Sequence, residues 1–148
     1  MSTCTFFGHR SCPDTIRPKL RKMLVDLIRD HKVELFYVGH QGQFDAIVRS
    51  TLRELKKEYP QVNYAVVLAY MPGKKTEYDD YSDTMLPEGI ESVHPHYAIS
   101  WRNNWMLQQS DYVVAYIAHA WGGAYQYTMK AKRHGIIVHN IGDIFVEL

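Results

Sequence analysis

The sequence predicts an α/β protein of one domain, in which a five-stranded parallel sheet alternates with helices along the chain. Two observations predict this class. Near-continuous apolar runs of strand length recur five times, and amphipathic segments of helical length lie between them. This alternation implies parallel strands joined by right-handed crossovers. The 148 residues suit a single domain, residues 1–148, with one core.

The expected strands are short runs rich in Val, Ile, Phe and Tyr, which favour extended and buried backbone. They are residues 3–7 (TCTFF), 34–38 (ELFYV), 64–70 (YAVVLAY), 111–117 (DYVVAYI) and 136–141 (IIVHNI).

The expected helices carry apolar residues at spacings of three and four. They are residues 16–28, 44–55, 98–109 and 124–134. Asp14 or Thr15 is available to cap the first of them, Pro18 suits its first turn, and Gly135 ends the last.

Residues 71–97 differ from the rest of the chain, because they contain several prolines, glycines and acids and no sustained period. A connection this long inside one domain is usually a functional lid or a disordered excursion. We expect a lid.

Charge and composition exclude several classes of protein. Seventeen Lys and Arg against sixteen Asp and Glu give a formal net charge of +1, so no strongly basic field favours nucleic acid as a partner. The basic residues within 17–22 are typical of a solvated helix face. No apolar run approaches the roughly 20 residues of a membrane span, and no signal peptide is evident. We therefore expect a cytoplasmic protein without a membrane partner.

The Cys and His residues do not have the spacing of metal ligands, so no metal site is expected. Cys4 and Cys12 suit reduced thiols, and His94 and His96 lack a matched carboxylate or a helical partner.

Three expected strands are each followed at once by glycine, in the stretches FFGHR, VGHQGQFD and HAWGGAYQY. The carboxyl ends of parallel strands share one edge of the sheet, where open α/β folds bind ligands. Glycine permits close approach of backbone, and free amides at a helix N-terminus favour an anion. A phosphate or carboxylate ligand at this edge is the natural expectation.

Several side chains near this edge have two interpretations. Arg10 is a phosphate-binding fork or a solvated arginine, and Arg102, on the helix face of Ile99 and Met106, contacts a ligand or snorkels to water. His9 is an acid, base or phosphate donor, or it satisfies a backbone carbonyl. Asp45 is a catalytic acid or base, or a helix cap.

The motifs FFGHR, VGHQGQFDAIV, YSDTMLPEGIE, RNNWMLQQSDYVVAYI and GGAYQYTMKAKRHG resemble the YpsA-like family of the SLOG superfamily, over about residues 3–141. The resemblance implies a Rossmann-like domain with helices on both faces of the sheet and strand order 3-2-1-4-5. It also implies a nucleotide or nucleotide-derived ligand, held between GHR and GGAYQY at the switch point.

The same superfamily includes phosphoribohydrolases that carry an Arg-Lys pair and the motif Pro-Gly-Gly-x-Gly-Thr-x-x-Glu. Here Arg102 matches the arginine, Asn103 replaces the lysine, and Met129 stands in place of the glutamate. Catalysis would then need another acid, and Asp45, Asp83 and Glu88 are the candidates.

The function expected from these features is binding or sensing of a nucleotide-like small molecule, without another cofactor. The alternatives are a nucleotide N-glycosidase and a module for protein interaction or homodimerisation. The ligand-binding residues expected are Gly8, His9, Arg10, Gly39, Gln41, Gly42, Asp45, Arg102, Asn103, Trp121, Gly122, Gly123, Ala124 and Tyr125.

Overall fold

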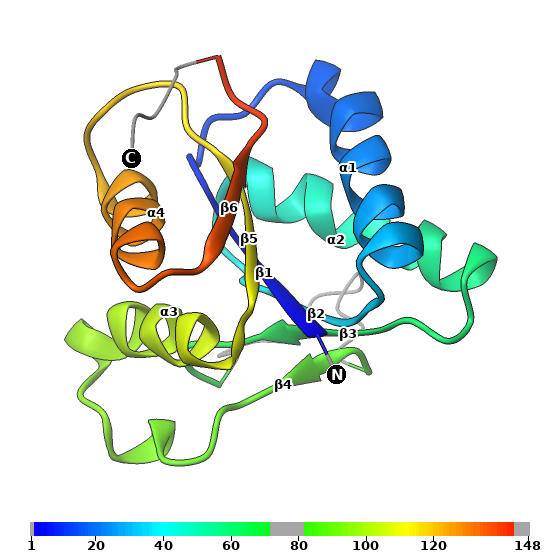
Figure 1. Cartoon of the computed structure of the whole chain (residues 1–148). Helices are drawn as coiled ribbons and strands as arrows, with labels where there is room; N and C mark the ends of the chain where they lie inside the picture. Colours follow the sequence, from blue (N-terminus) through cyan, green and yellow to red (C-terminus); the bar gives the residue numbers. More distant parts are fainter. Residues whose placement is uncertain (1, 72–81, 144–148) are drawn as a thin grey trace.

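The computed structural model describes residues 2–71 and 82–143, and within these ranges it contains one six-stranded parallel sheet (Figure 1). The strands are β1 Ser2–Gly8, β2 Val33–Val38, β3 Asn63–Val67, β4 Thr84–Met85, β5 Tyr112–Tyr116 and β6 Ile137–Asn140. The α-helices are α1 Arg17–Asp30, α2 Gly42–Glu58, α3 Ala98–Gln109 and α4 Gly123–Arg133.

The strand order is β4-β3-β2-β1-β5-β6, and every neighbouring pair is parallel. The expected α/β class and the relative order of the five expected strands are confirmed. The order reverses between β1 and β5, which pair directly from Cys4 with Tyr112 to Gly8 with Tyr116. The switch point therefore lies where it was expected, with the loops after β1 and β5 side by side.

The expected number of five strands is wrong, because β4 adds a sixth strand at the edge of β3 in the described part of the chain. Backbone hydrogen bonds hold it there, from Val66 N to Asp83 O at 2.8 Å and from Leu68 N to Met85 O at 2.9 Å. A strand of two residues is too short to show a period of two, so the sequence pattern did not reveal it.

Helices cover both faces of the sheet (Figure 1). The face under α1 and α2 forms a core around Phe6, Phe36 and Phe44, each no more than 1% exposed. The face under α3 and α4 forms a second core that includes Met106 and Ala131. Apolar side chains on both sides of each strand explain why the strands read as continuous apolar runs rather than as alternating ones.

The helix boundaries agree with the expected ranges to within a few residues, and the end of the second helix shows the largest difference, since α2 extends to Glu58 rather than to residue 55. Asp14 to Ile16 form a 3-10 turn, and α1 begins at Arg17 without a side-chain cap. Pro18 lies in the first turn of α1, as expected. Gly135 follows α4 with a φ of 78°, as a helix-ending glycine does.

The expected lid at 71–97 lies partly outside the described residues, since 72–81 are not described. The described remainder contains β4 and two 3-10 turns, Ile90–Ser92 and Pro95–Tyr97. This part has regular structure, and its role as a lid stays a prediction.

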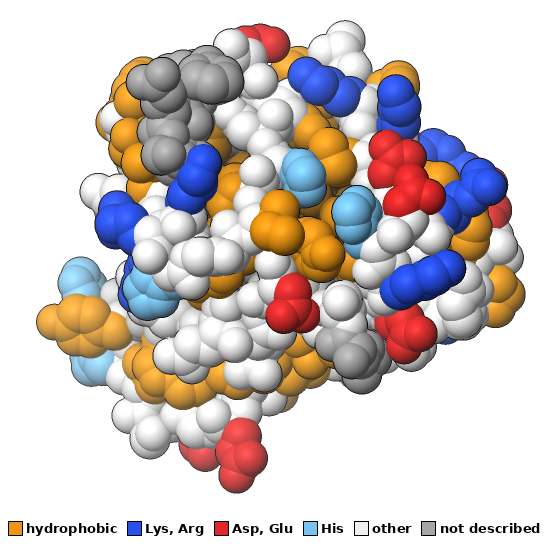
Figure 2. Space-filling model, in the orientation of Figure 1, with side chains coloured by type: hydrophobic (Ala, Val, Ile, Leu, Met, Phe, Trp, Pro, Cys, Tyr) orange, Lys and Arg blue, Asp and Glu red, His pale blue; other side chains and the backbone are white. Residues whose placement is uncertain are grey.

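Charged side chains of both signs mix over α1 and α2, on the right of Figure 2. Arg17 pairs with Asp14, and Arg21 pairs with Glu58. This face therefore carries no field of a single sign. No described helix is long and apolar enough to cross a bilayer.

We predict that Gly8→Ala destabilises the protein by about 1–3 kcal/mol, since overpacking a filled core costs about this much. A Cβ on Gly8 would lie 2.1 Å from Cδ2 of Phe44, whose side chain is fully buried. Gly123→Ala is the matched control, because a Cβ there meets nothing within 4 Å. Urea unfolding measures both changes, and equal midpoints for Gly8→Ala and the wild type would contradict the prediction.

Candidate functional site

A cavity of about 440 Å³ opens at the carboxyl ends of β1 and β5, at the switch point of the sheet. Loops after three strands and the inner face of α3 form its walls. The residues that line it are Phe6, Phe7, Gly8, His9, Arg10, Ser11, Gln41, Asp45, Ile99, Arg102, Asn103, Met106, His119, Gly123 and Ala124.

The structure brings most of the predicted ligand-binding residues together around this cavity. Those that line it are Gly8, His9, Arg10, Gln41, Asp45, Arg102, Asn103, Gly123 and Ala124. Those that lie beside it without lining it are Gly39, Gly42, Trp121, Gly122 and Tyr125. The grouping is a fact of the fold, whereas the binding role of each residue stays a prediction.

The amino end of α2 is closed by the protein itself. Gln43 N donates to the carbonyl of Arg10 at 2.7 Å, and Cys12 N donates to the Gln43 side chain at 2.8 Å. Gly42 makes this approach possible, since a Cβ on it would lie 2.6 Å from Cα of Arg10. The backbone amide of Gln43 is therefore already occupied and is not available to an anion.

Among the described residues, none closes the amino end of α4. Gly122 precedes the helix with a φ of 93°, a conformation that favours glycine. The first intrahelical bond runs from Gln126 N to Gly122 O, and the amides of Gly123, Ala124 and Tyr125 donate to no acceptor in the described ranges. Free amides at a helix N-terminus attract an anion, and two of these residues line the cavity.

Arg102 is a cation buried in the wall of the cavity, with 2% of the residue exposed. Its Nη1 donates to the carbonyl of Val67 at 2.9 Å, and its Nε donates to Oδ1 of Asn103 at 2.9 Å. Its Nη2 has no acceptor, and no carboxylate forms an ion pair with it, among residues 2–71 and 82–143. The guanidinium of Arg102 thus keeps one nitrogen, Nη2, that has no acceptor among the described residues.

Asp45 is a buried carboxylate in the first turn of α2, with 8% of the residue exposed. Its Oδ2 accepts from the backbone amide of Gln41 at 3.0 Å, so this oxygen caps the start of α2. Its Oδ1 accepts nothing from the described residues. Burial raises the pKa of Asp45 from 3.8 to about 6, although the Gln41 amide, Arg102 and Arg49 oppose the rise. The group titrates close to neutral pH.

Gly39 lies against both of these side chains and leaves no space for a Cβ. A Cβ on it would lie 2.8 Å from Oδ2 of Asp45 and 3.1 Å from Nη1 of Arg102. Any larger residue would therefore push the carboxylate and the guanidinium away from each other. Gly39 acts behind the wall of the cavity rather than on a ligand.

A stack of three rings forms the wall next to α4. The rings of His9 and His119 lie 3.6 Å apart at 15°, and those of His119 and Trp121 lie 3.5 Å apart at 24°. Burial, and then the adjacent His119, lower the pKa of His9. His9 Nε2 and His119 Nδ1 are buried without a partner in the described structure. The stack forms a planar aromatic wall.

Sequence reasoning missed some residues of the cavity. His119 was not predicted as a residue of the ligand site, and its position shortly after the end of β5 was the signal that could have placed it here. Phe6, Phe7, Ile99 and Met106 form an apolar floor, and Ser11 lies at the rim. Apolar residues of this kind cannot be told from ordinary core residues by pattern alone.

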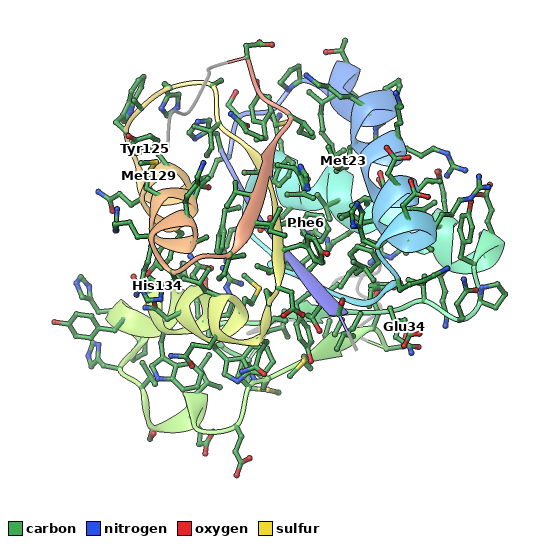
Figure 3. All side chains as sticks on the ribbon, in the orientation of Figure 1. Phe6, Met23, Glu34, Tyr125, Met129 and His134 are labelled. Atoms are coloured by element: carbon green, nitrogen blue, oxygen red, sulfur yellow. The ribbon has the colours of Figure 1, made fainter. Side chains whose placement is uncertain are left out.

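Other candidates lie away from the cavity. Asp83 Oδ2 accepts from Arg53 Nε at 3.2 Å and from the Tyr64 hydroxyl at 2.9 Å, and Glu88 is exposed. Met129 follows Tyr125 by one turn of α4 (Figure 3). It does not line the cavity. Neither Asp83 nor Glu88 lines the cavity, so neither supplies a carboxylate to it in the described arrangement.

No protein-family model and no curated protein matches this chain. Within the described ranges, no group of three or more His, Cys, Asp or Glu residues could hold a metal ion. His94 and His96 are both exposed, and Nδ1 of His94 accepts from the backbone amide of His96 at 3.0 Å. The chemistry of the cavity is thus that of Arg102, Asp45, the α4 amides and the ring stack.

We predict that Asp45→Asn stabilises the protein at pH 7–8 by on the order of 2–3 kcal/mol. The folded pKa of Asp45 is raised, so the neutral carboxyl favours the fold. The stabilising contribution of the neutral Asp45 carboxyl is complete below its pKa in the unfolded chain. It is lost as the pH rises through the folded pKa of about 6. Urea unfolding from pH 4 to pH 8 should show the gap between variant and wild type opening over this range. A constant gap across the range would contradict the prediction.

Proposed function

We propose that this protein binds a nucleotide or a nucleotide-derived small molecule in the cavity, with the ligand's phosphate at the amino end of α4. The observation that carries the proposal is the open set of amides at Gly123 and Ala124, in the same cavity as the buried guanidinium of Arg102. Both features supply positive potential to a site that is partly shielded from water, where an anion is held more strongly than at the surface.

The burial of Arg102 supports this proposal. A guanidinium taken out of water without a carboxylate partner is costly, and a ligand anion would compensate that cost. Val67 and Asn103 hold the guanidinium in place before any ligand arrives. A donor that is already ordered loses little conformational freedom on binding.

The size and the walls of the cavity agree with a nucleotide-like ligand. Its volume of about 440 Å³ lies within the roughly 300–1,000 Å³ of small-molecule sites. The ring stack offers planar surfaces beside the phosphate position, and Trp121 is 65% exposed at the outer end. The resemblance to the YpsA-like family points to the same class of ligand.

We predict that Gly123→Pro weakens binding of the ligand roughly 10- to 100-fold, as expected for one charge-assisted hydrogen bond. Proline at the first position of a helix leaves the helix intact and removes the amide donor. Gly123→Ala is the matched control, since it keeps the amide and its Cβ meets nothing within 4 Å. Calorimetry with nucleoside monophosphates, dinucleotides, cyclic dinucleotides and ADP-ribose measures the affinities.

Two outcomes would contradict this proposal. The first is a wild-type protein that binds no member of the panel. The second is an equal affinity for the proline and alanine variants, which would remove the α4 amide from the site.

A second candidate function is hydrolysis of an N-glycosidic bond, and the position of Asp45 favours it. The carboxylate faces the cavity with Oδ1 unengaged, and its pKa of about 6 suits a general base near neutral pH. The Asp45 carboxylate would deprotonate a water molecule. That water would attack the sugar while the bond between the sugar and the nucleobase breaks.

We predict for this second candidate that nucleoside monophosphates release free base on incubation, measured by chromatography. Asp45→Asn should lower the rate roughly 100-fold or more, as loss of a general base does. Asp83→Asn is the control, because Asp83 is held by Arg53 and Tyr64 outside the cavity. Unchanged turnover in Asp45→Asn would exclude this residue from the chemistry.

A further inference from the structure

We propose that Asp45 and Arg102 together recognise a hydroxyl group on the sugar of the ligand, so that the site prefers a ribose phosphate to a deoxyribose phosphate. This inference rests on the proposed function. It divides the cavity into a phosphate position at the start of α4 and a hydroxyl position between α2 and α3.

The hydroxyl position is defined by two groups that each lack a partner in the described structure. Nη2 of Arg102 is a donor without an acceptor, since Nε and Nη1 are already used. Oδ1 of Asp45 is an acceptor without a donor, since Oδ2 holds the Gln41 amide. Both residues are more than nine-tenths buried and line the same cavity. Neither of these two atoms is itself fully buried, so each can reach a group bound in the cavity that both residues line.

The two groups lie close together without pairing. Both side chains converge beside Gly39, where a Cβ would be 2.8 Å from Asp45 and 3.1 Å from Arg102. The Asp45 carboxylate and the Arg102 guanidinium are not within ion-pair distance of each other in the described structure. Because both residues also line the cavity, the free Nη2 and the free Oδ1 are available to one group bound there.

The chemistry of the pair selects a hydroxyl. A hydroxyl accepts one hydrogen bond and donates another, so it satisfies the guanidinium and the carboxylate at once. A phosphate oxygen has no proton to donate and is repelled by the carboxylate, whereas an ammonium group has no lone pair to accept. Repulsion by Asp45 also directs the phosphate of the ligand toward the amides of α4.

Ribose 5-phosphate and 2-deoxyribose 5-phosphate test the proposal, because they share the phosphate and lack a base. Calorimetry should give the wild-type protein a preference of roughly 10- to 100-fold for ribose 5-phosphate, the range of a hydrogen bond to a charged group. Asp45→Asn should reduce that preference to less than about threefold, since the partner becomes neutral. Asp83→Asn should retain it, because Asp83 lies outside the cavity.

AMP, 2′-deoxy-AMP and 3′-deoxy-AMP give a second measurement on the wild-type protein alone, which does not depend on whether Asp45→Asn folds. A loss of affinity with 2′-deoxy-AMP supports the proposal, whereas a loss confined to 3′-deoxy-AMP overturns the preference for ribose over deoxyribose.

The outcomes separate this inference from the proposed function. Equal affinity for the ribose and deoxyribose forms, with Gly123→Pro still weakening both, overturns the hydroxyl position and leaves the phosphate position standing. A preference for ribose that persists in Asp45→Asn also overturns the assignment to Asp45. No binding of any phosphate compound by the wild-type protein overturns both proposals.

Discussion

The cavity depends on one buried interaction, the hydrogen bond from the Arg102 guanidinium to the carbonyl of Val67. This bond joins α3 to the carboxyl end of β3, and it places a charged group where the pattern of α3 alone would place an apolar one. Ile99 and Met106 share its helix face and form the floor of the cavity. The position of the inner face of α3 therefore depends on the positive charge of Arg102. The nearby Asp45 carboxylate neutralises that charge only in part.

The sequence pattern was sufficient to predict five of the six strands and the inward position of Arg102, whereas the switch point was predicted from the resemblance to the YpsA-like family. The apolar runs and the spacing of Ile99, Arg102 and Met106 follow directly from the periods of strands and helices. It was not sufficient for β4, whose backbone bonds involve no side-chain pattern. It also could not reveal the contact of His9 with His119, since two residues 110 positions apart meet only when β1 and β5 pair.

The glycine loops looked equivalent in the sequence and differ in the structure. Glycine at 42 allows another segment of backbone to come close, so the start of α2 is filled by Arg10. Glycine at 122 allows a turn with positive φ, and no atom of the described residues fills the space beside it at the start of α4. The same residue type therefore closes one site and opens another, and only the tertiary neighbours decide which.

The ring stack beside the cavity also gives the molecule a built-in optical probe. The indole of Trp121 is 65% exposed and lies against His119, whose own ring borders the cavity. The other indoles belong to α3, where Trp101 lies 3.6 Å from the Cβ position of Gly89 and Trp105 meets the ring of Tyr37 at 5.1 Å. A fluorescence change that disappears in Trp121→Phe therefore comes from the cavity wall, and it reports occupancy without a label.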